Sequence, residues 1–191
     1  LNTKKAGISF DISEAAPEGY SLSTITYKPE TVTIAGALSD IRSIYNLNIP
    51  AEALNPERKT GRVEQTVDIS QYLPENVIIP EEDEHDIVVT MEIVANETVN
   101  YSFTPDQIEY ENTADDLQVD RSNSETVIVP VSGLASALSD LTADSITVTA
   151  DMSGVSKTGT YTVPVTVTLP DGFSCPQDLG MTVHVVSSKE E

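Results

Sequence analysis

The sequence predicts a mainly β fold, organised as two tandem small β domains with one short helix in each. Three features of the 191 residues point to it: an internal repeat, short stretches of alternating apolar and polar residues, and turn residues at the ends of those stretches. Long helical patterns between the stretches are absent, which argues against parallel βαβ units. Each domain is therefore expected to be a sandwich or a rolled sheet.

The internal repeat has a period of roughly 95 residues, which is an ordinary size for a small domain. The pentapeptide that begins at Ala37 recurs with one change at Ala137, and a glycine precedes both copies. Further matched pairs are Gly61 and Gly159, Leu73-Pro74 and Leu169-Pro170, and Pro80 and Pro176. We predict two copies of one domain, residues 1–95 and 96–191, with a boundary near residues 95–99 and no flexible linker.

Residues 160–169 give the clearest strand, because apolar side chains occupy the odd positions and Thr the even ones, apart from Pro164. Proline has no N–H, so we expect a sheet edge or a bulge at Pro164. Residues 62–69 are the less regular equivalent in the first repeat. Other strands are expected at residues 7–12, 31–35, 87–94, 126–131, 145–150 and 181–186. Residues 112–125 are either a long loop with a short strand through 117–119 or a mobile segment.

The repeated Ala-Leu-Ser-Asp segments are the helical exception. The apolar residues recur at helical spacing, with Leu38, Ile41 and Tyr45 in the first copy and Leu134, Leu138 and Leu141 in the second. We expect about two helical turns that plug one end of each sheet. A substrate-binding helix is the alternative.

Composition excludes several classes of partner. A net charge of −21 repels phosphate backbones and anionic membrane surfaces, so nucleic acid is not an expected partner. The acid excess favours solubility, with a specific cationic partner as the alternative. The chain has no apolar run of the roughly 18 residues that span a bilayer, and its first residue, Leu1, falls at the opening of a strand. We therefore expect an excised segment of a longer protein.

Residues suited to catalysis are few. His85 lies in an acidic run, and His184 alternates with Val183 and Val185, so it is expected to point off the core with Thr182. Cys175 is the single cysteine, which rules out an intrachain disulfide, and it has no basic neighbour to lower its pKa. Because no nucleotide-binding or nucleophile motif is present, we predict no enzyme activity, no catalytic residues and no cofactor.

The acidic run Glu81, Glu82, Asp83, Glu84, His85 and Asp86 could wrap a hard cation such as calcium. The calcium-loop pattern is missing, however, and the matching loop of the second repeat holds only Asp178. We therefore prefer a solvated loop and predict no metal site. Carbohydrate binding is weakly supported, because Trp is absent and the dispersed tyrosines suit packing near strand ends; those are Tyr20, Tyr27, Tyr72, Tyr101 and Tyr110.

The order of turns and strands resembles the YbbR-like repeat. The first copy shows it in Pro17-Glu18-Gly19-Tyr20 and in the segment from Pro29 to Gly36. The second copy shows it in residues 127–133, 150–154 and 159–165. Where the second copy reads Asp-Met-Ser-Gly, the first has Ala53-Leu54-Asn55-Pro56, and the second lacks a clear Pro-Glu-Gly-Tyr. The resemblance covers nearly the whole chain, although its motifs are structural turns and strand starts.

This resemblance implies a bacterial protein with one N-terminal membrane helix and several such repeats outside the cytoplasm. Its best-understood relatives, similar to CdaR, regulate a membrane-bound diadenylate cyclase that makes cyclic di-AMP, so a membrane protein is the expected partner. The family implies no catalytic residues. The alternative function is a structural spacer or an adhesin-like surface array. An exposed strand edge is the expected place for a partner to dock, because unpaired backbone groups invite strand addition.

Overall fold

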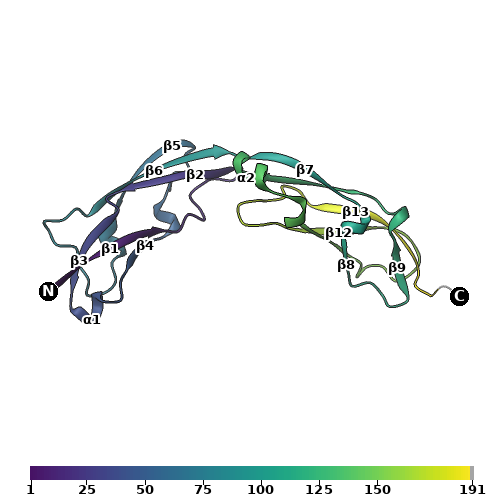
Figure 1. Cartoon of the computed structure of the whole chain (residues 1–191), viewed down its shortest axis with the longest axis horizontal. Helices are drawn as coiled ribbons and strands as arrows, with labels where there is room; N and C mark the ends of the chain where they lie inside the picture. Colours follow the sequence, from purple (N-terminus) through teal and green to yellow (C-terminus); the bar gives the residue numbers. More distant parts are fainter. Residues whose placement is uncertain (190–191) are drawn as a thin grey trace. The chain divides into compact units, whose positions relative to one another are not determined.

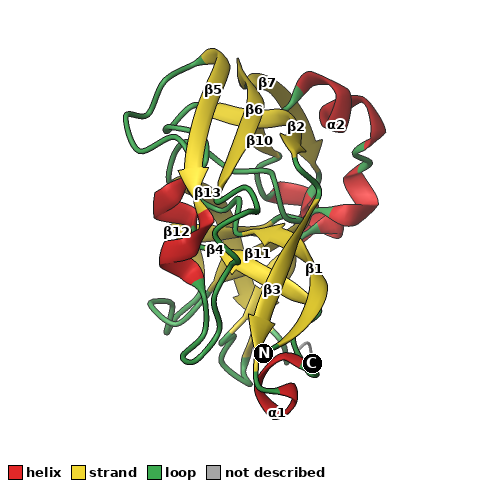
Figure 2. Ribbon diagram, turned by 90° about the vertical axis from the view of Figure 1, so that its left-hand side faces the viewer, coloured by secondary structure: helices red, strands yellow, loops and turns green. Residues whose placement is uncertain are grey.

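The computed structural model describes residues 1–189, and its chain forms two compact units, Leu1–Ala95 and Asn96–Glu191 (Figure 1). The last two residues of the second predicted repeat, 190 and 191, lie outside the described residues. Strands dominate both units (Figure 2), which confirms the mainly β prediction. Each unit contains one short α-helix, α1 (Leu38–Ile41) in the first and α2 (Ala135–Asp140) in the second.

The first unit contains two three-stranded sheets, in the orders β3-β1-β4 and β2-β6-β5. The strand bounds are β1 (Asn2–Phe10), β2 (Tyr20–Lys28), β3 (Thr31–Gly36), β4 (Asn46–Ile49), β5 (Gly61–Asp68) and β6 (Asp86–Ala95). β1 pairs with β3 in antiparallel fashion up to Gly7 and from Gly7 onward with β4 in parallel. Short 3-10 turns η1 (Ala51–Ala53) and η2 (Ile69–Tyr72) follow β4 and β5.

The two sheets of the first unit share one aliphatic core. It draws on alternate residues of both sheets, such as Ile34 on β3 and Met91 on β6, which are fully buried. Phe10 and Tyr27 add an edge-to-face ring pair with centroids 4.8 Å apart. Burial of branched aliphatic side chains from two facing sheets is the main stabilising contribution to a fold that contains few aromatic residues.

The second unit has a two-stranded sheet, β10-β7, and a five-stranded sheet, β8-β11-β12-β13-β9. The strands are β7 (Glu97–Phe103), β8 (Glu109–Glu111), β9 (Leu117–Asp120), β10 (Val127–Gly133), β11 (Thr147–Asp151), β12 (Gly159–Thr168) and β13 (Leu179–Ser187). The 3-10 turns are η3 (Pro105–Gln107), η4 (Arg121–Asn123) and η5 (Ala143–Ser145). This unit has its own core, centred on Val129, Val131 and Val183.

The pairing pattern shows how the units correspond. β7 and β8 together take the place of β1, because β7 pairs with the strand before the helix and β8 pairs in parallel with the strand after it. Likewise β5 corresponds to β12 and β6 to β13, since both pairs are antiparallel and both open with a glycine, Gly61 or Gly159. A lone bridge recurs as well, between Ala35 and Ile78 and between Ser132 and Ser174.

Most predicted strands are confirmed. All eight expected stretches lie wholly or largely within strands, and the short strand expected through 117–119 is β9. The sequence interpretation missed β2, β4, β7 and β8. β2 escaped it because a bulge between Leu22 and Thr24 shifts the apolar alternation from even to odd positions within one strand.

The predicted helical face is wrong for the first repeat. Leu38 is 62% exposed and Tyr45 is 74% exposed, and only Ile41 of the three residues is buried. The glycines before the helices show which positions are equivalent. One residue separates each glycine from the first residue of its helix, so Ile41 corresponds to Leu138, and both are buried. The repeated pentapeptides are therefore offset by three positions from structural equivalence.

The edge prediction for Pro164 needs a correction too. β12 as a whole is an interior strand between β11 and β13, and its register with β13 continues without a bulge through Pro164 and Gly180. The ladder with β11, however, begins only at Val165. Pro164 therefore lies just beyond the end of that ladder, where Asp151, the last residue of β11, would be next in register.

Candidate functional site

The acidic run of the first unit lies in the loop that leads into β6. The carboxylate-bearing side chains from Glu81 to Glu84 are exposed, and His85 is half-buried. The backbone carbonyl of His85 accepts a 2.9 Å hydrogen bond from the N–H of Ile69, which joins the loop to the end of β5. Throughout residues 1–189, no three His, Cys, Asp or Glu side chains are placed to hold a metal ion.

His184 on β13 lies where the alternation predicted, because Val183 and Val185 are buried and His184 and Thr182 are partly exposed. Its Nδ1 lies 3.1 Å from Oγ1 of Thr160 on β12, and its register partner on β9 is Asp120. A hydroxyl, an imidazole and a carboxylate thus occupy three adjacent strands. The sequence alone could not reveal this row, because the three positions are brought together only by strand pairing.

This row does not form a catalytic triad. The Asp120 carboxylate accepts from the N–H and Oγ of Ser122 at 3.1 and 2.6 Å and from Nδ2 of Asn123 at 2.6 Å. These hydrogen bonds, with that of the Ser122 side chain first, lower the pKa of Asp120. Its carboxylate therefore holds the η4 turn rather than orienting an imidazole, as a triad requires.

Cys175 and the tyrosines also have structural roles. Cys175 is half-buried at the margin of the second core, and its Sγ lies 3.3 Å from the Gln177 carbonyl. Tyr27 and Tyr101 donate to the carbonyls of Ile8 and Leu141, each at 3.2 Å. The packing role expected from the sequence is therefore confirmed for Tyr27 and Tyr101, whose hydroxyls are paired to backbone rather than free to bind a sugar, whereas Tyr20 is 39% exposed.

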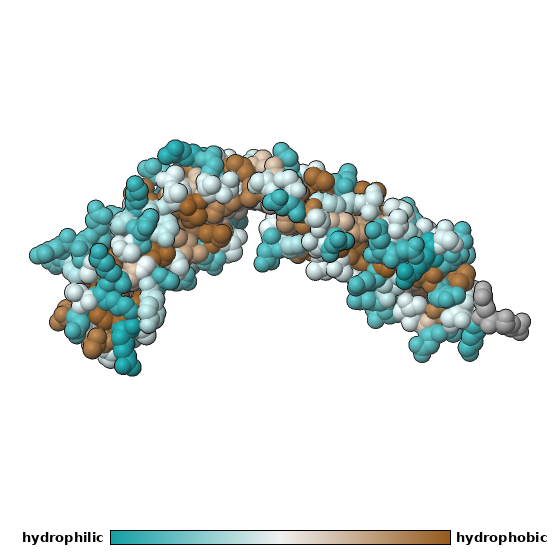
Figure 3. All heavy atoms as spheres, viewed as in Figure 1, coloured by the Kyte–Doolittle hydropathy of each residue, from teal (hydrophilic) through white to brown (hydrophobic). Residues whose placement is uncertain are grey.

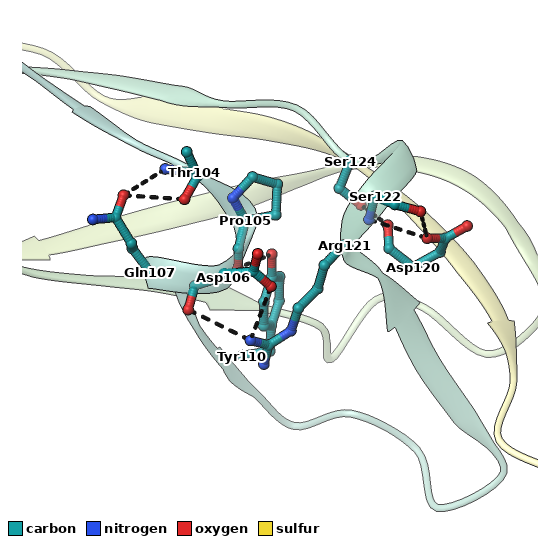
Figure 4. Close-up of polar contacts among 9 residues, drawn as sticks. All are labelled: Thr104, Pro105, Asp106, Gln107, Tyr110, Asp120, Arg121, Ser122 and Ser124. Carbon is teal, nitrogen blue, oxygen red and sulfur yellow. Dashed lines mark hydrogen bonds and ion pairs between the residues drawn. The ribbon is translucent and has the colours of Figure 1, made fainter.

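A polar cluster in the second unit joins η3 to η4 (Figure 4). Nη1 of Arg121 lies 3.7 Å from Oδ1 of Asp106 and 3.5 Å from its carbonyl oxygen, and the guanidinium carbon lies 5.4 Å from the centre of the Tyr110 ring. Burial is the main cause that raises the pKa of Tyr110, and its hydroxyl donates to the Pro105 carbonyl at 3.1 Å. Because the ion pair is exposed, its contribution to stability is small.

Figure 4 also shows Gln107 turned back onto Thr104, whose N–H donates to Oε1 of Gln107 at 2.9 Å. This hydrogen bond satisfies a backbone group at the start of the η3 turn, where the chain passes from β7 to β8. The cluster thus fixes a crossing between sheets, and nothing in its geometry suggests a bound ligand.

Exposed apolar side chains gather at the α1 end of the first unit, where Figure 3 shows brown surface. Leu1, Leu38 and Tyr45 are 90%, 62% and 74% exposed. Nζ of Lys4 lies 4.2 Å from the centre of the Tyr45 ring and donates to the Arg42 carbonyl at 2.9 Å. The hydrogen bond to the end of the helix therefore holds the Lys4 cation beside the Tyr45 ring.

β5 lies beside β6 at one margin of its sheet, so its other edge is open, as is the edge of β2 at the opposite margin (Figure 2). The hydrogen bond from Ile69 to His85 sets the alternation, so odd residues of β5 bind β6. Arg62, Glu64 and Thr66 consequently direct their N–H and C=O groups away from β6. All three are exposed, and within residues 1–189 none of these backbone groups has a backbone partner.

The same edge is closed over only part of its length in the second unit. There β11 pairs with β12 from Val165 to Thr168, and Pro164 follows immediately beyond that ladder. Strand edges were expected as docking places from the sequence, but which edge is open depends on long-range pairing. No helix within residues 1–189 has both the length and the apolar character needed to cross a membrane.

The comparison with protein-family models identifies one family. The model of YbbR-like proteins matches residues 8–91 and 106–174, which confirms the resemblance read from the turns. Two solved structures are similar, each with a low TM-score. A YbbR-like protein from Streptococcus pneumoniae TIGR4 has 14% identity and a TM-score of 0.29, covering 98% of this chain and 97% of its own.

The second structure is SuR18C from Streptococcus thermophilus, with 16% identity and a TM-score of 0.36, covering 49% of this chain and 85% of its own. The comparison with curated proteins finds no match. The family model spans most of both units and coincides with their recurring strands and turns. The chain therefore belongs to the YbbR-like family.

Proposed function

We propose that this chain is a non-enzymatic protein-binding module, which acts outside the cytoplasm as part of a membrane-anchored regulator. The observation that carries the proposal is the open edge of β5, an eight-residue strand whose outward backbone groups lack backbone partners among the described residues. Unpaired backbone groups on a sheet edge favour the addition of a strand from another protein. Membership in the YbbR-like family supports the extracytoplasmic location and the regulatory role.

The polar groups of the chain support binding over catalysis. The one row that combines hydroxyl, imidazole and carboxylate has its carboxylate engaged in a turn, as described above. The partner that the family suggests is a membrane protein, and a membrane-bound diadenylate cyclase is the first to test. Regulation would then consist of a change in cyclic di-AMP synthesis when the module binds.

The test is capture of the cyclase from detergent-solubilised bacterial membranes, with this chain as immobilised bait beside its full-length anchored protein. Retention of the cyclase by both baits is the expected result and assigns recognition to the repeats. Retention by the anchored protein alone would contradict the proposal, because contact would then run through another segment. The chain would instead be a structural spacer or part of an adhesin-like array.

A further inference from the structure

We infer that the β5 edge of the first unit binds an extended segment of the partner that carries two basic residues four positions apart, by adding it as a fourth strand to the sheet β2-β6-β5. The inference rests on the proposed function and deepens it, since it names the contact surface and the chemistry of the segment. Two comparisons between the units and the charge along β5 lead to it.

The first comparison concerns proline. Thr66 and Pro164 are each the fifth residue after the glycine that opens their strand, so they occupy equivalent positions. The N–H of Glu125 donates to the Thr182 carbonyl, so Thr182 directs its backbone away from β12. Pro164, two residues beyond the register partner of Thr182, faces the side of β12 on which β11 pairs, just past the end of that ladder. The second unit thus lacks an N–H at the position where the first unit presents that of Thr66.

The second comparison concerns β3 in the first unit and its equivalent, β10, in the second. Ala35 and Ser132 both bond outward, to Ile78 and Ser174, so the residues two positions earlier also face outward. Those residues are Thr33 in the first unit and Pro130 in the second. Proline at an edge position blocks strand addition. Two positions that face away from the neighbouring antiparallel strand, β13 for Pro164 and β7 for Pro130, therefore hold proline in the second unit and threonine in the first.

The third observation is the charge along β5. Arg62, Glu64, Thr66 and Asp68 share one face of the strand in that order. Arg62 is opposite Glu92 on β6, so it has an acid beside it already, whereas Asp68 is opposite another acid, Asp86. Like charges in directly opposed positions repel. An added strand with basic residues facing Glu64 and Asp68 would relieve that repulsion.

An antiparallel partner strand with the pattern Lys-x-Val-x-Lys-x-Glu meets these requirements. Its residues would face Asp68, Thr66, Glu64 and Arg62 in turn, giving three opposite-charge pairs and one pair of β-branched residues. The other face of β5 carries Val63 and Val67, which belong to the core. Specificity would therefore come from the exposed face, and the backbone hydrogen bonds would contribute affinity for many sequences.

The test uses the synthetic peptide Lys-Thr-Val-Thr-Lys-Thr-Glu with blocked ends, titrated into the whole chain and followed by amide chemical shifts. We expect shifts at residues 61–68 and about tenfold weaker binding to Thr66→Pro, the effect of roughly 1.4 kcal/mol. Thr66→Pro preserves every charge and removes an N–H that has no partner among residues 1–189, so it separates strand addition from general attraction to an acidic protein. Thr66→Val keeps the N–H and is the matched control, expected to bind as the parent chain does.

A peptide with exchanged charges, Glu-Thr-Val-Thr-Glu-Thr-Lys, should bind weakly to the parent chain. Should Thr66→Pro fail to fold, Glu64→Lys serves instead: it should weaken the first peptide and strengthen one with Glu at the facing position. Equal binding to the parent chain and Thr66→Pro, or no binding to the parent chain, would overturn the inference. Self-association that Thr66→Pro abolishes would assign the edge to a second copy and overturn it as well.

These outcomes are separable from those of the proposed function. If the cyclase is captured equally by the parent chain and by Thr66→Pro, the module binds its partner through another surface and only the inference about β5 fails. If the parent chain binds the peptide but retains no membrane protein, the edge is competent for strand addition but the proposed partner is wrong.

Discussion

The two units have the same order of strands, yet they treat their open edges differently. In the second unit β12 extends to Thr168 and pairs with β11, whereas in the first unit β5 ends at Asp68 and turns into η2. Asp68 causes this turn locally, because its carboxylate accepts from the N–H and Oγ of Ser70 at 3.0 and 2.5 Å. Two copies of one domain can thus differ in binding capacity through the end of a single strand.

A second difference lies in the side chain that holds the loop after β4 in the first unit and the loop after β11 in the second. In the first unit Asn55, a neutral amide that is 2% exposed, bonds to backbone groups of Ala15 and Lys59. In the second unit an ionisable group has the equivalent task, since Asp151 accepts from Nδ2 of Asn112 and the N–H of Ser153, each at 2.9 Å. The units should therefore respond differently to mutation and to acid.

The largest expected effect tests the corrected helix register. Ile41→Ala should lower the free energy of unfolding of the first unit by about 3 kcal/mol, because it empties a buried site. Leu38→Ala, at the position that the repeated pentapeptide equates with Leu138, should change it by less than about 0.5 kcal/mol, as is usual for an exposed residue. Urea unfolding followed by NMR signals from each unit measures both. A larger effect at Leu38 than at Ile41 would restore the pentapeptide register.

Asn55→Ala should cost the first unit about 2 kcal/mol, because it leaves buried backbone groups without partners. Asn55 also has a φ of 46°, a left-handed conformation that asparagine adopts more readily than alanine. Asp151→Ala, the matched change in the second unit, should have a smaller effect since that side chain is more exposed. The same urea series decides the order, and equal losses would contradict the contrast between Asn55 and Asp151.

The glycines before the two helices provide a paired test of close packing. A Cβ at Gly36 would lie 2.9 Å from Cγ2 of Ile41, and one at Gly133 would lie 2.8 Å from Cδ1 of Phe173. Either alanine substitution should cost about 1–2 kcal/mol through overpacking. Combining Gly36→Ala with Ile41→Ala should cost less than the sum of the two single changes, because the second removes the colliding methyl group. Strict additivity in thermal unfolding would contradict this contact.

The smallest expected effect concerns acid. The hydrogen bond from Asn112 is the largest cause that lowers the pKa of Asp151 from its usual 3.8. A carboxyl group whose pKa is lower in the folded state stabilises the fold above its unfolded pKa, and this contribution fades as the pH falls below about 3.8 toward the folded value. The hydrogen bonds of Asn55 join an amide to backbone groups, none of which titrates in this pH range. An NMR titration from pH 5 to pH 2 should show Asn112 amide signals changing with Asp151, and Asn112→Ala should move that transition to higher pH.

The sequence predicted the fold class because the alternation in residues 160–169 is a local signal of a half-buried strand. It could not predict the register of the helices, since identity between two short segments does not show which side chain meets the core. It suggested a strand edge as a docking place but could not single out β5, because an edge is defined by a strand that fails to pair. The Arg121 cluster and the hydrogen bonds of Asn55 join residues far apart along the chain, and no spacing rule anticipates them.

The most direct test of the account is hydrogen exchange of the chain with and without its captured membrane partner. The account predicts slower exchange of the amides of Arg62, Glu64 and Thr66 in the complex, because added-strand hydrogen bonds would protect them. It also predicts no change at Thr160 and Thr162 on the equivalent strand of the second unit. Protection confined to the second unit, or a complex that leaves β5 exchanging as in the free chain, would contradict the claim that the first repeat is the docking unit.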